Sequence, residues 1–218
     1  VGAPGGTLSG MAADTPPDAP TRHARRAPAP AERRRDAERT RQRILDAALA
    51  EFAAKGFAGA RVADIAERAG LNQQLISYYF GGKEGLYAEL LARWHEREVE
   101  LDDPAGTLAD LVVAYLDANC DQPDMARLLV WDELTAHGDV EIGPGEAPEV
   151  ADVRRRQQAG EIAADLDPGF LLLALMGAVA AGVTMPRMAA RVTGVDPATP
   201  EFATRYREEL RRLVGRLR

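Results

Sequence analysis

The sequence predicts an all-α protein, with a small N-terminal unit of three helices followed by a larger C-terminal helical bundle. Apolar residues recur at three- and four-residue steps from about residue 31 onward, and Gly or Pro separates the periodic segments. No β-alternating run of useful length and no internal repeat is present in the sequence. We therefore expect a disordered tail over 1–30, a three-helix unit over 31–83 and a helical domain over 84–218.

The tail and the first helix open the chain. Residues 1–30 are rich in Gly, Pro and Ala and lack large apolar groups, a composition typical of disorder. Met11 within them is a plausible start of the natural protein. The next segment, ERTRQRILDAALAEFAAKGF, is amphipathic, and Gly56 is expected to end its helix.

Two short helices and a longer one follow. ARVADIAERAG places its apolar residues on one face and ends at Gly70. LNQQLISYYF forms the next short helix, for which Asn72 is a natural N-cap. The pair Gly81–Gly82 then breaks the chain, and KEGLYAELLARWHEREVEL predicts a longer helix. Beyond Pro104 we expect five more helices, over 106–120, 124–137, 148–164, 168–192 and 199–217.

Composition excludes several classes of protein. The chain has 218 residues and a formal net charge of −7, and its apolar content is that of an ordinary soluble protein. No window of about 18 uncharged apolar residues exists, so we expect no transmembrane helix and no membrane partner. The N-terminus lacks the basic and apolar regions of a secretory signal. A single cysteine, Cys120, fits a reducing cytoplasm, which is the expected location.

Positive charge is concentrated near the N-terminus. Residues 1–80 hold twelve Lys and Arg against nine Asp and Glu, whereas the remainder holds fifteen against twenty-five. Most of the excess lies in an arginine-rich arm that includes Arg33, Arg34 and Arg35. Such an arm favours a polyanionic partner for one end of the protein. A solubilising tail explains it equally well.

The spacing of the short helices predicts a helix-turn-helix, whose second helix enters the major groove of DNA. Ile76 and Phe80 are four residues apart and are expected to pack inward. Gln73, Gln74, Ser77 and Tyr78 then lie on the other face. Glutamine reads adenine bidentately in the major groove, and tyrosine hydroxyls reach phosphates.

Residues 39–91 resemble the N-terminal DNA-binding domain of the TetR (tetracycline-repressor) family of bacterial transcriptional regulators. The resemblance rests on RILDAALAEFAAKGF, on VADIAERAGL and on the YYF-x-x-KEGL ending that joins the third helix to the fourth. It implies a helix-turn-helix domain over 31–83 and a ligand-binding, dimerising domain over 84–218. The DNA contacts are then expected from Arg61, Asn72, Gln73, Gln74, Leu75, Ser77, Tyr78, Tyr79 and Lys83.

Two departures from the family pattern concern base reading. The family usually has Thr or Ser at the start of the second helix, where Arg61 stands here, so the cap is expected to be lost while a phosphate contact remains available. The family also commonly has tyrosine at the position of Ser77 and a small polar residue at that of Leu75. Leu75 is therefore expected to meet a thymine methyl group.

In the family the C-terminal bundle holds a ligand pocket, and its last two helices form the dimer. Candidate pocket residues are Trp94, Tyr115, Met125, Leu129, Trp131 and Met176, each of which plain core packing explains too. Candidate dimer residues are Leu173, Gly177, Ala178, Ala181, Gly182, Leu210 and Leu213. A core helix of a monomer is the alternative for this segment.

The sequence offers no catalytic constellation, metal site or cofactor motif. Its three histidines are scattered, and GPGE over 143–146 lacks the context of a phosphate loop. The predicted function is a ligand-responsive, homodimeric transcriptional regulator, usually a repressor, that binds a palindromic DNA operator and an unknown small-molecule effector. The alternative is a helical small-molecule-binding or partner-binding protein whose helix-turn-helix no longer reads specific DNA.

Overall fold

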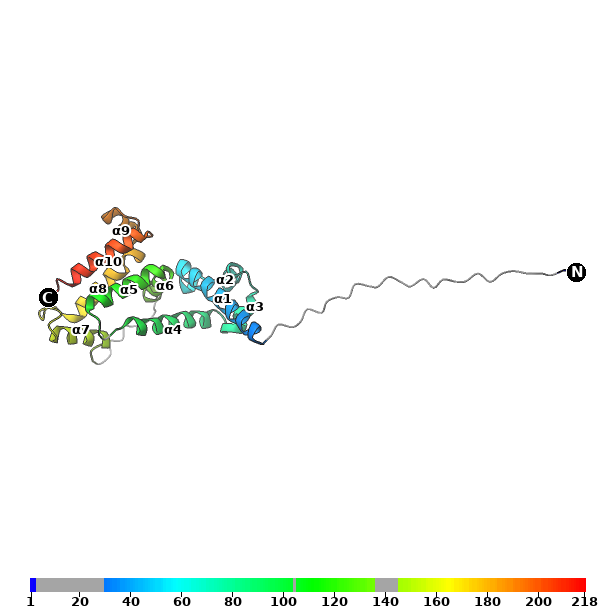
Figure 1. Cartoon of the computed structure of the whole chain (residues 1–218), viewed down its shortest axis with the longest axis horizontal. Coiled ribbons are helices and arrows are strands. Elements are labelled where there is room, and N and C mark those ends of the chain that lie inside the picture. The colour runs from blue at the N-terminus through cyan, green and yellow to red at the C-terminus, as the bar shows by residue number, and fades with distance from the viewer. Residues whose placement is uncertain (3–29, 104, 136–144) are drawn as a thin grey trace.

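The computed structural model describes residues 1–2, 30–103, 105–135 and 145–218, and the predicted tail falls almost wholly outside these ranges. The described residues form ten helices and no strand, so the all-α prediction is confirmed. Figure 1 shows α1–α3 at one end of the molecule and α7–α10 at the other, with α4 running between them. Helix α3 and helices α7–α10 are thus far apart.

The N-terminal helices follow the predicted pattern closely. They are α1 (Pro30–Gly59), α2 (Val62–Ala69), α3 (Gln73–Phe80) and α4 (Lys83–Leu101). Gly56 interrupts α1 with a positive φ of 66° and an extended ψ of 174°, which is the break that the sequence predicted. Gly70 ends α2 in the left-handed conformation, where glycine carries no Cβ penalty.

The C-terminal helices are α5 (Leu108–Asp121), α6 (Pro123–Thr135), α7 (Pro148–Gln158), α8 (Pro168–Thr184), α9 (Pro186–Thr193) and α10 (Pro200–Val214). The helix predicted over 148–164 is wrong at its end, because it stops at Gln158. Residues 136–137 of the second predicted helix lie outside the described ranges. The predicted starts at 148 and 168 match, and the other predicted boundaries differ by one to three residues.

The single helix predicted over 168–192 is also wrong. The chain bends by 94° between α8 and α9, with Met185 at the corner. Pro186 explains the bend, because a proline inside a helix lacks an N–H donor and its ring clashes with the preceding turn. No single helix in the described ranges is long and apolar enough to span a membrane, although this bent pair passes such a test by length and composition.

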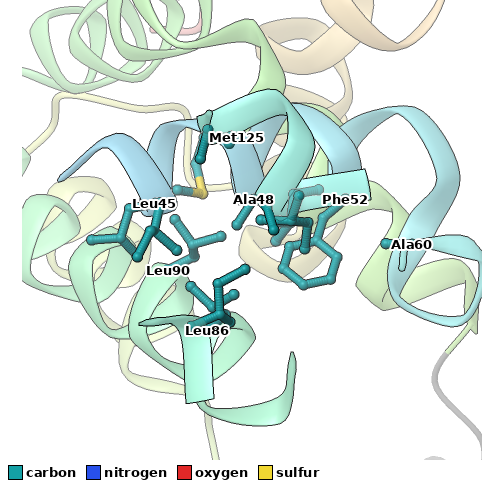
Figure 2. Packing of buried hydrophobic residues seen from close by; sticks show 14 of the residues in the cluster. Leu45, Ala48, Phe52, Ala60, Leu86, Leu90 and Met125 are labelled. Carbon is teal, nitrogen blue, oxygen red and sulfur yellow. The ribbon is translucent and has the colours of Figure 1, made fainter. Parts of the chain in front are cut away.

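Two apolar clusters hold the molecule together. The first joins α1–α4 to α5 and α6, and it contains fully buried Phe52, Ile65 and Ile76. Figure 2 shows Met125 of α6 reaching into this cluster beside Leu45. The second cluster packs α5, α7, α8 and α10 against each other. The N-terminal core is therefore continuous with the first helices of the C-terminal bundle.

Candidate nucleic-acid interface

The reading helix α3 has defined ends and one anchored face. The Asn72 side chain accepts a hydrogen bond of 2.8 Å from the backbone N–H of Gln74, as an N-cap should. Gly81 closes the helix in the left-handed conformation. Ile76 is fully buried in the N-terminal core, and Phe80 packs against that core while partly buried. These contacts fix which face of the helix turns outward.

The outward face of α3 is polar. Gln73, Gln74 and Ser77 are exposed, and Tyr78 is 79% exposed. The rings of Tyr78 and Tyr79 meet edge to face, with centroids 5.0 Å apart. The exposed side chains offer donors, acceptors and an aromatic hydroxyl to a groove or a phosphate backbone.

Leu75 and Tyr79 stand between the two faces of α3. Both are partly buried and pack against the N-terminal core. The thymine contact expected of Leu75 therefore has only part of that side chain available. Tyr79 thus packs partly inward, whereas Tyr78 is exposed.

The turn from α3 into α4 depends on glycine. A Cβ on Gly85 would lie 1.7 Å from the backbone oxygen of Phe80, so no larger residue fits unless the backbone moves. Gly82 has a φ of 121° at the N-cap position of α4. Lys83 then opens α4, where its Nζ lies 4.5 Å from the centroid of the Phe57 ring. The helix N-terminus and this ammonium together favour a phosphate at the turn.

The start of α2 matches the predicted loss of a cap. Arg61 occupies the N-cap position without a side-chain capping bond, and it is exposed. Two ionic contacts stiffen this region instead. Lys55 of α1 pairs with buried Glu51 and, at 2.9 Å, with Asp64 of α2. The Arg61 guanidinium is thus available to a phosphate.

Sequence reasoning missed a contact that holds the turn of the helix-turn-helix. The guanidinium of Arg43 donates to the backbone oxygen of Ala69 at 2.5 Å. A Cβ on Gly70 would lie 3.1 Å from the same guanidinium. In the sequence Arg43 is one of many arginines in the basic region, so nothing distinguishes it as the residue that contacts Ala69.

Helix α6 connects helices α1–α4, which we call the reading unit, to the C-terminal bundle. The Tyr87 hydroxyl on α4 donates to the carboxylate of Asp132 on α6 at 2.6 Å. Burial and this carboxylate raise the pKa of Tyr87 far above its usual value, so the hydroxyl stays protonated. The neighbouring residue on α6, Trp131, covers Gly56 of α1 with its indole, and a Cβ on Gly56 would lie 3.1 Å from the ring. A shift of α6 therefore acts on both α1 and α4.

The six candidate pocket residues do not surround one cavity in the described part of the chain. Trp94 and Met125 are buried in the N-terminal core, with Tyr115 and Leu129 partly buried against it. Trp131 is 39% exposed and lines a groove on the surface. Met176 is 60% exposed on α8. The core explanation therefore fits four of the six.

The candidate dimer residues divide into two groups. Leu173, Gly177 and Leu213 are exposed on the outer sides of α8 and α10. Leu210 is only 3% exposed and belongs to the core of the protomer, so the sequence-based assignment of this side chain needs correction. The amphipathic pattern of α10 does not distinguish burial in its own protomer from burial in a partner.

Some of the small residues of α8 make contacts within the protomer. A Cβ on Gly182 would lie 2.9 Å from the Phe202 ring, so this glycine admits α10 rather than a second copy. Ala178 is partly buried, and its backbone oxygen accepts a hydrogen bond of 2.6 Å from the Tyr206 hydroxyl. Ala181 is also partly buried.

Comparison with known families matches both parts of this architecture. A model described as bacterial regulatory proteins of the tetR family matches residues 44–90. A second model, for tetracyclin repressor-like C-terminal domains, matches residues 107–216. The chain belongs to the TetR family. It is therefore a DNA-binding transcriptional regulator with a helix-turn-helix.

Individual proteins are similar to this TetR-family regulator along most of its length. It is 35% identical to the HTH-type transcriptional repressor SCO4008 of Streptomyces coelicolor, over 84% of this chain and 98% of the relative. The solved structure of SCO4942 from Streptomyces coelicolor is 32% identical with a TM-score of 0.62, covering 80% and 96% of the two chains. A gamma-butyrolactone receptor, 20% identical with a TM-score of 0.55 over 82% and 98%, shares the fold.

Proposed function

We propose that this TetR-family regulator represses transcription as a homodimer that binds a palindromic operator. The observation that carries the proposal is the outward face of α3, on which Gln73, Gln74, Ser77 and Tyr78 are exposed beside anchored Ile76. Repression is supported by the printed name of SCO4008, a relative that matches over nearly its whole length. The protein acts in the cytoplasm, on the bacterial chromosome.

The proposed base contacts come from the two glutamines, whose amides pair with adenine edges. The proposed backbone contacts come from the hydroxyls of Tyr78 and Tyr79, from Arg61 and from Lys83 at the start of α4. Arg33 of the arginine-rich arm is exposed near the start of α1 and is a further candidate for a backbone contact. Counterion release at these contacts makes the affinity fall steeply with salt.

The proposed dimer forms through the outer sides of α8 and α10. Phe170, Leu173 and Met176 are 76%, 65% and 60% exposed on α8, and Leu213 is 53% exposed on α10. So many large apolar side chains on adjoining helices are unusual for the surface of a monomer. A two-fold symmetric dimer covers them and presents two α3 helices to two half-sites.

The proposed effector binds the C-terminal domain and opposes DNA binding by linkage, because it prefers a conformation with wrongly spaced reading helices. The route is supported by α6, which contacts α1 through Trp131 and α4 through Asp132. The effector need not approach the DNA, since α6 joins both domains.

The test is to incubate the full chain with fragmented DNA of its own genome, at physiological salt, and to sequence the retained fragments. Recovery of a few sites that share a palindrome is the expected result. Retention that is salt-sensitive but indifferent to sequence would overturn the proposal. It would favour the alternative, a small-molecule- or partner-binding protein, for which the uncapped α2 and the partly buried Leu75 are the supporting observations.

A further inference from the structure

A groove of about 300 Å³ lies where α1, α6 and the corner between α8 and α9 meet. Ala53 lines it from α1, Trp131 and Leu134 line it from α6, and Val183 and Pro186 line it from the corner. Of the six candidate pocket residues, Trp131 alone is among the residues that line it. Its volume is at the lower end of the range for small-molecule sites.

The lining selects a chemical class. Its walls are mainly apolar, and Arg127 is the one charged side chain among its lining residues. The guanidinium donates to Asp124 through Nη1 at 2.7 Å, and the pair is exposed. An arginine has five N–H donors in a planar fork, so the remaining donors can receive a carboxylate while the pair persists.

The position of the groove ties it to the reading unit. Trp131 forms one wall, and the same indole covers Gly56, where α1 is interrupted just before α2. Ala53 lines the groove from α1, one helical turn before that break, and is buried. A ligand in the groove contacts α1 and α6 where they pack together, so it can shift α1 relative to α6, and α1 carries α2 and α3 with it.

We propose that this groove binds a small apolar carboxylate and that its occupation weakens DNA binding. The inference rests on the proposed function for its regulatory part, because it assumes that α3 binds DNA. The binding part stands on the groove alone. The apolar body of the ligand lies against Trp131, Leu134 and Val183, and its carboxylate faces Arg127.

Binding is tested with three eight-carbon probes: octanoate, octan-1-ol and octylammonium. Trp94→Phe leaves Trp131 as the sole tryptophan, so its fluorescence reports the groove directly. If that buried substitution disturbs folding, the indole N–H signals of the unaltered chain, assigned with Trp131→Phe, provide the same readout. We expect saturable octanoate binding with a Kd below about 1 mM, weaker octanol binding and none of octylammonium.

Two variants test the site, and a third serves as control. Arg127→Gln and Leu134→Ser should each weaken octanoate binding at least about tenfold, and Arg127→Gln should make octanoate no better than octanol. Val99→Ser is the matched control, because Val99 is 77% exposed on α4 and Leu134 is 75% exposed. Octanoate binding that is absent, or unchanged in both groove variants, would overturn the inference.

Regulation is tested separately by DNA retention. Saturating octanoate should lower the affinity of the unaltered chain for its retained fragments about tenfold, a coupling usual for allosteric sites, with no such effect in Arg127→Gln. Octanoate binding without any change in DNA affinity would overturn the regulatory role. Absence of specific DNA retention even without octanoate would be a failure of the proposed function, and fluorescence would still decide the binding site.

Sedimentation of the same variants excludes a different occupant. Leu134→Ser should leave the oligomeric state unchanged, because the groove holds a small molecule. If that substitution alone dissociated the protein, the groove would belong to the interface between two copies, and the ligand inference would be overturned.

Discussion

The reading unit buries its inward-facing apolar side chains, whereas the C-terminal helices leave several large apolar side chains exposed. In α1–α4 the large aliphatic and aromatic residues that face inward are almost completely covered, with Ile44, Phe52 and Ile76 at 0% exposure. On α8 and α9 large apolar residues remain open, among them Phe170, Leu173 and Val192 at 76%, 65% and 69%. One region is thus covered within the protomer, whereas the other leaves apolar area that the proposed dimer would cover.

The same contrast holds for what each region exposes. The outward face of α3 consists of amides and hydroxyls, groups that form hydrogen bonds with water as readily as with DNA. The outer sides of α8 and α10 expose apolar area, whose contact with water is unfavourable. Water satisfies the polar groups on α3, whereas the exposed apolar area of α8 and α10 is what the proposed dimer would remove from water.

The most disruptive test of this contrast is a charge on the open apolar surface. Leu173→Asp should convert the dimer into a monomer, raising the dimer dissociation constant at least about a hundredfold, because an unpaired carboxylate is costly to bury. Operator binding should be lost with it. Sedimentation equilibrium and DNA retention measure the two effects.

The control for this substitution is Val99→Asp, at an apolar position on α4 that is 77% exposed, against 65% for Leu173. It should change neither the oligomeric state nor the thermal midpoint by much. A Leu173→Asp protein that stays dimeric and binds its operator would contradict the assignment of α8 to the interface.

The next test compares two glycines. Gly85→Ala should lower the free energy of unfolding by about 3 kcal/mol, because the new Cβ would lie 1.7 Å from the oxygen of Phe80. Gly177→Ala on α8 meets nothing within 4 Å in the protomer, so it should raise helix stability by about 0.5–1 kcal/mol. Urea unfolding of a monomeric Leu173→Asp background measures both. Equal effects of the two substitutions would erase the proposed contrast between tight and open packing.

A smaller effect is expected on the reading face. Gln73→Ala or Gln74→Ala should cost about 1–3 kcal/mol of operator binding and relax the preference at one base position, because a bidentate base contact is lost. Retention of randomised operators measures both changes. The thermal midpoint serves as control and should hold, since the two side chains are exposed. Unchanged preference at every position would remove the glutamines from the base contacts.

The smallest effect concerns Lys83. Lys83→Ala should weaken binding to specific and non-specific DNA alike and reduce the salt slope by about one unit. Its contact with the Phe57 ring also contributes about 0.5–1 kcal/mol to folding, so the free energy of unfolding must be measured in parallel. A change in sequence preference, rather than in overall affinity, would show that Lys83 reads bases.

Much of the reading unit was predictable because its signals are local. The Asn72 cap, the breaks at Gly56 and Gly70 and the inward position of Ile76 all follow from neighbours within one or two helical turns. The identities of the exposed residues on α3 follow from the same periodicity, since knowing one face of a short helix determines the other. The prediction of base contacts remains untested by the structure.

The C-terminal predictions were weaker because their signals are not local. The pattern of α8 is apolar nearly all round, so it does not indicate which side a partner would cover. The prediction that this helix continues beyond Met185 did not take account of Pro186. Leu210 and Gly182 were assigned to the dimer, but α10 covers the glycine and the protomer core takes the leucine. Periodicity identifies a buried face without identifying what buries it.

By itself the sequence determined the helical class, the position of the reading helix and the family, because each depends on spacing along the chain. Only the tertiary structure decided which residues far apart in sequence meet. It paired Trp131 with Gly56, Tyr87 with Asp132, and buried Arg156 with the backbone oxygen of Gly106. The physical reason is that the chemistry of a side chain depends on its residue type alone, whereas its contact partner depends on how whole helices pack against each other.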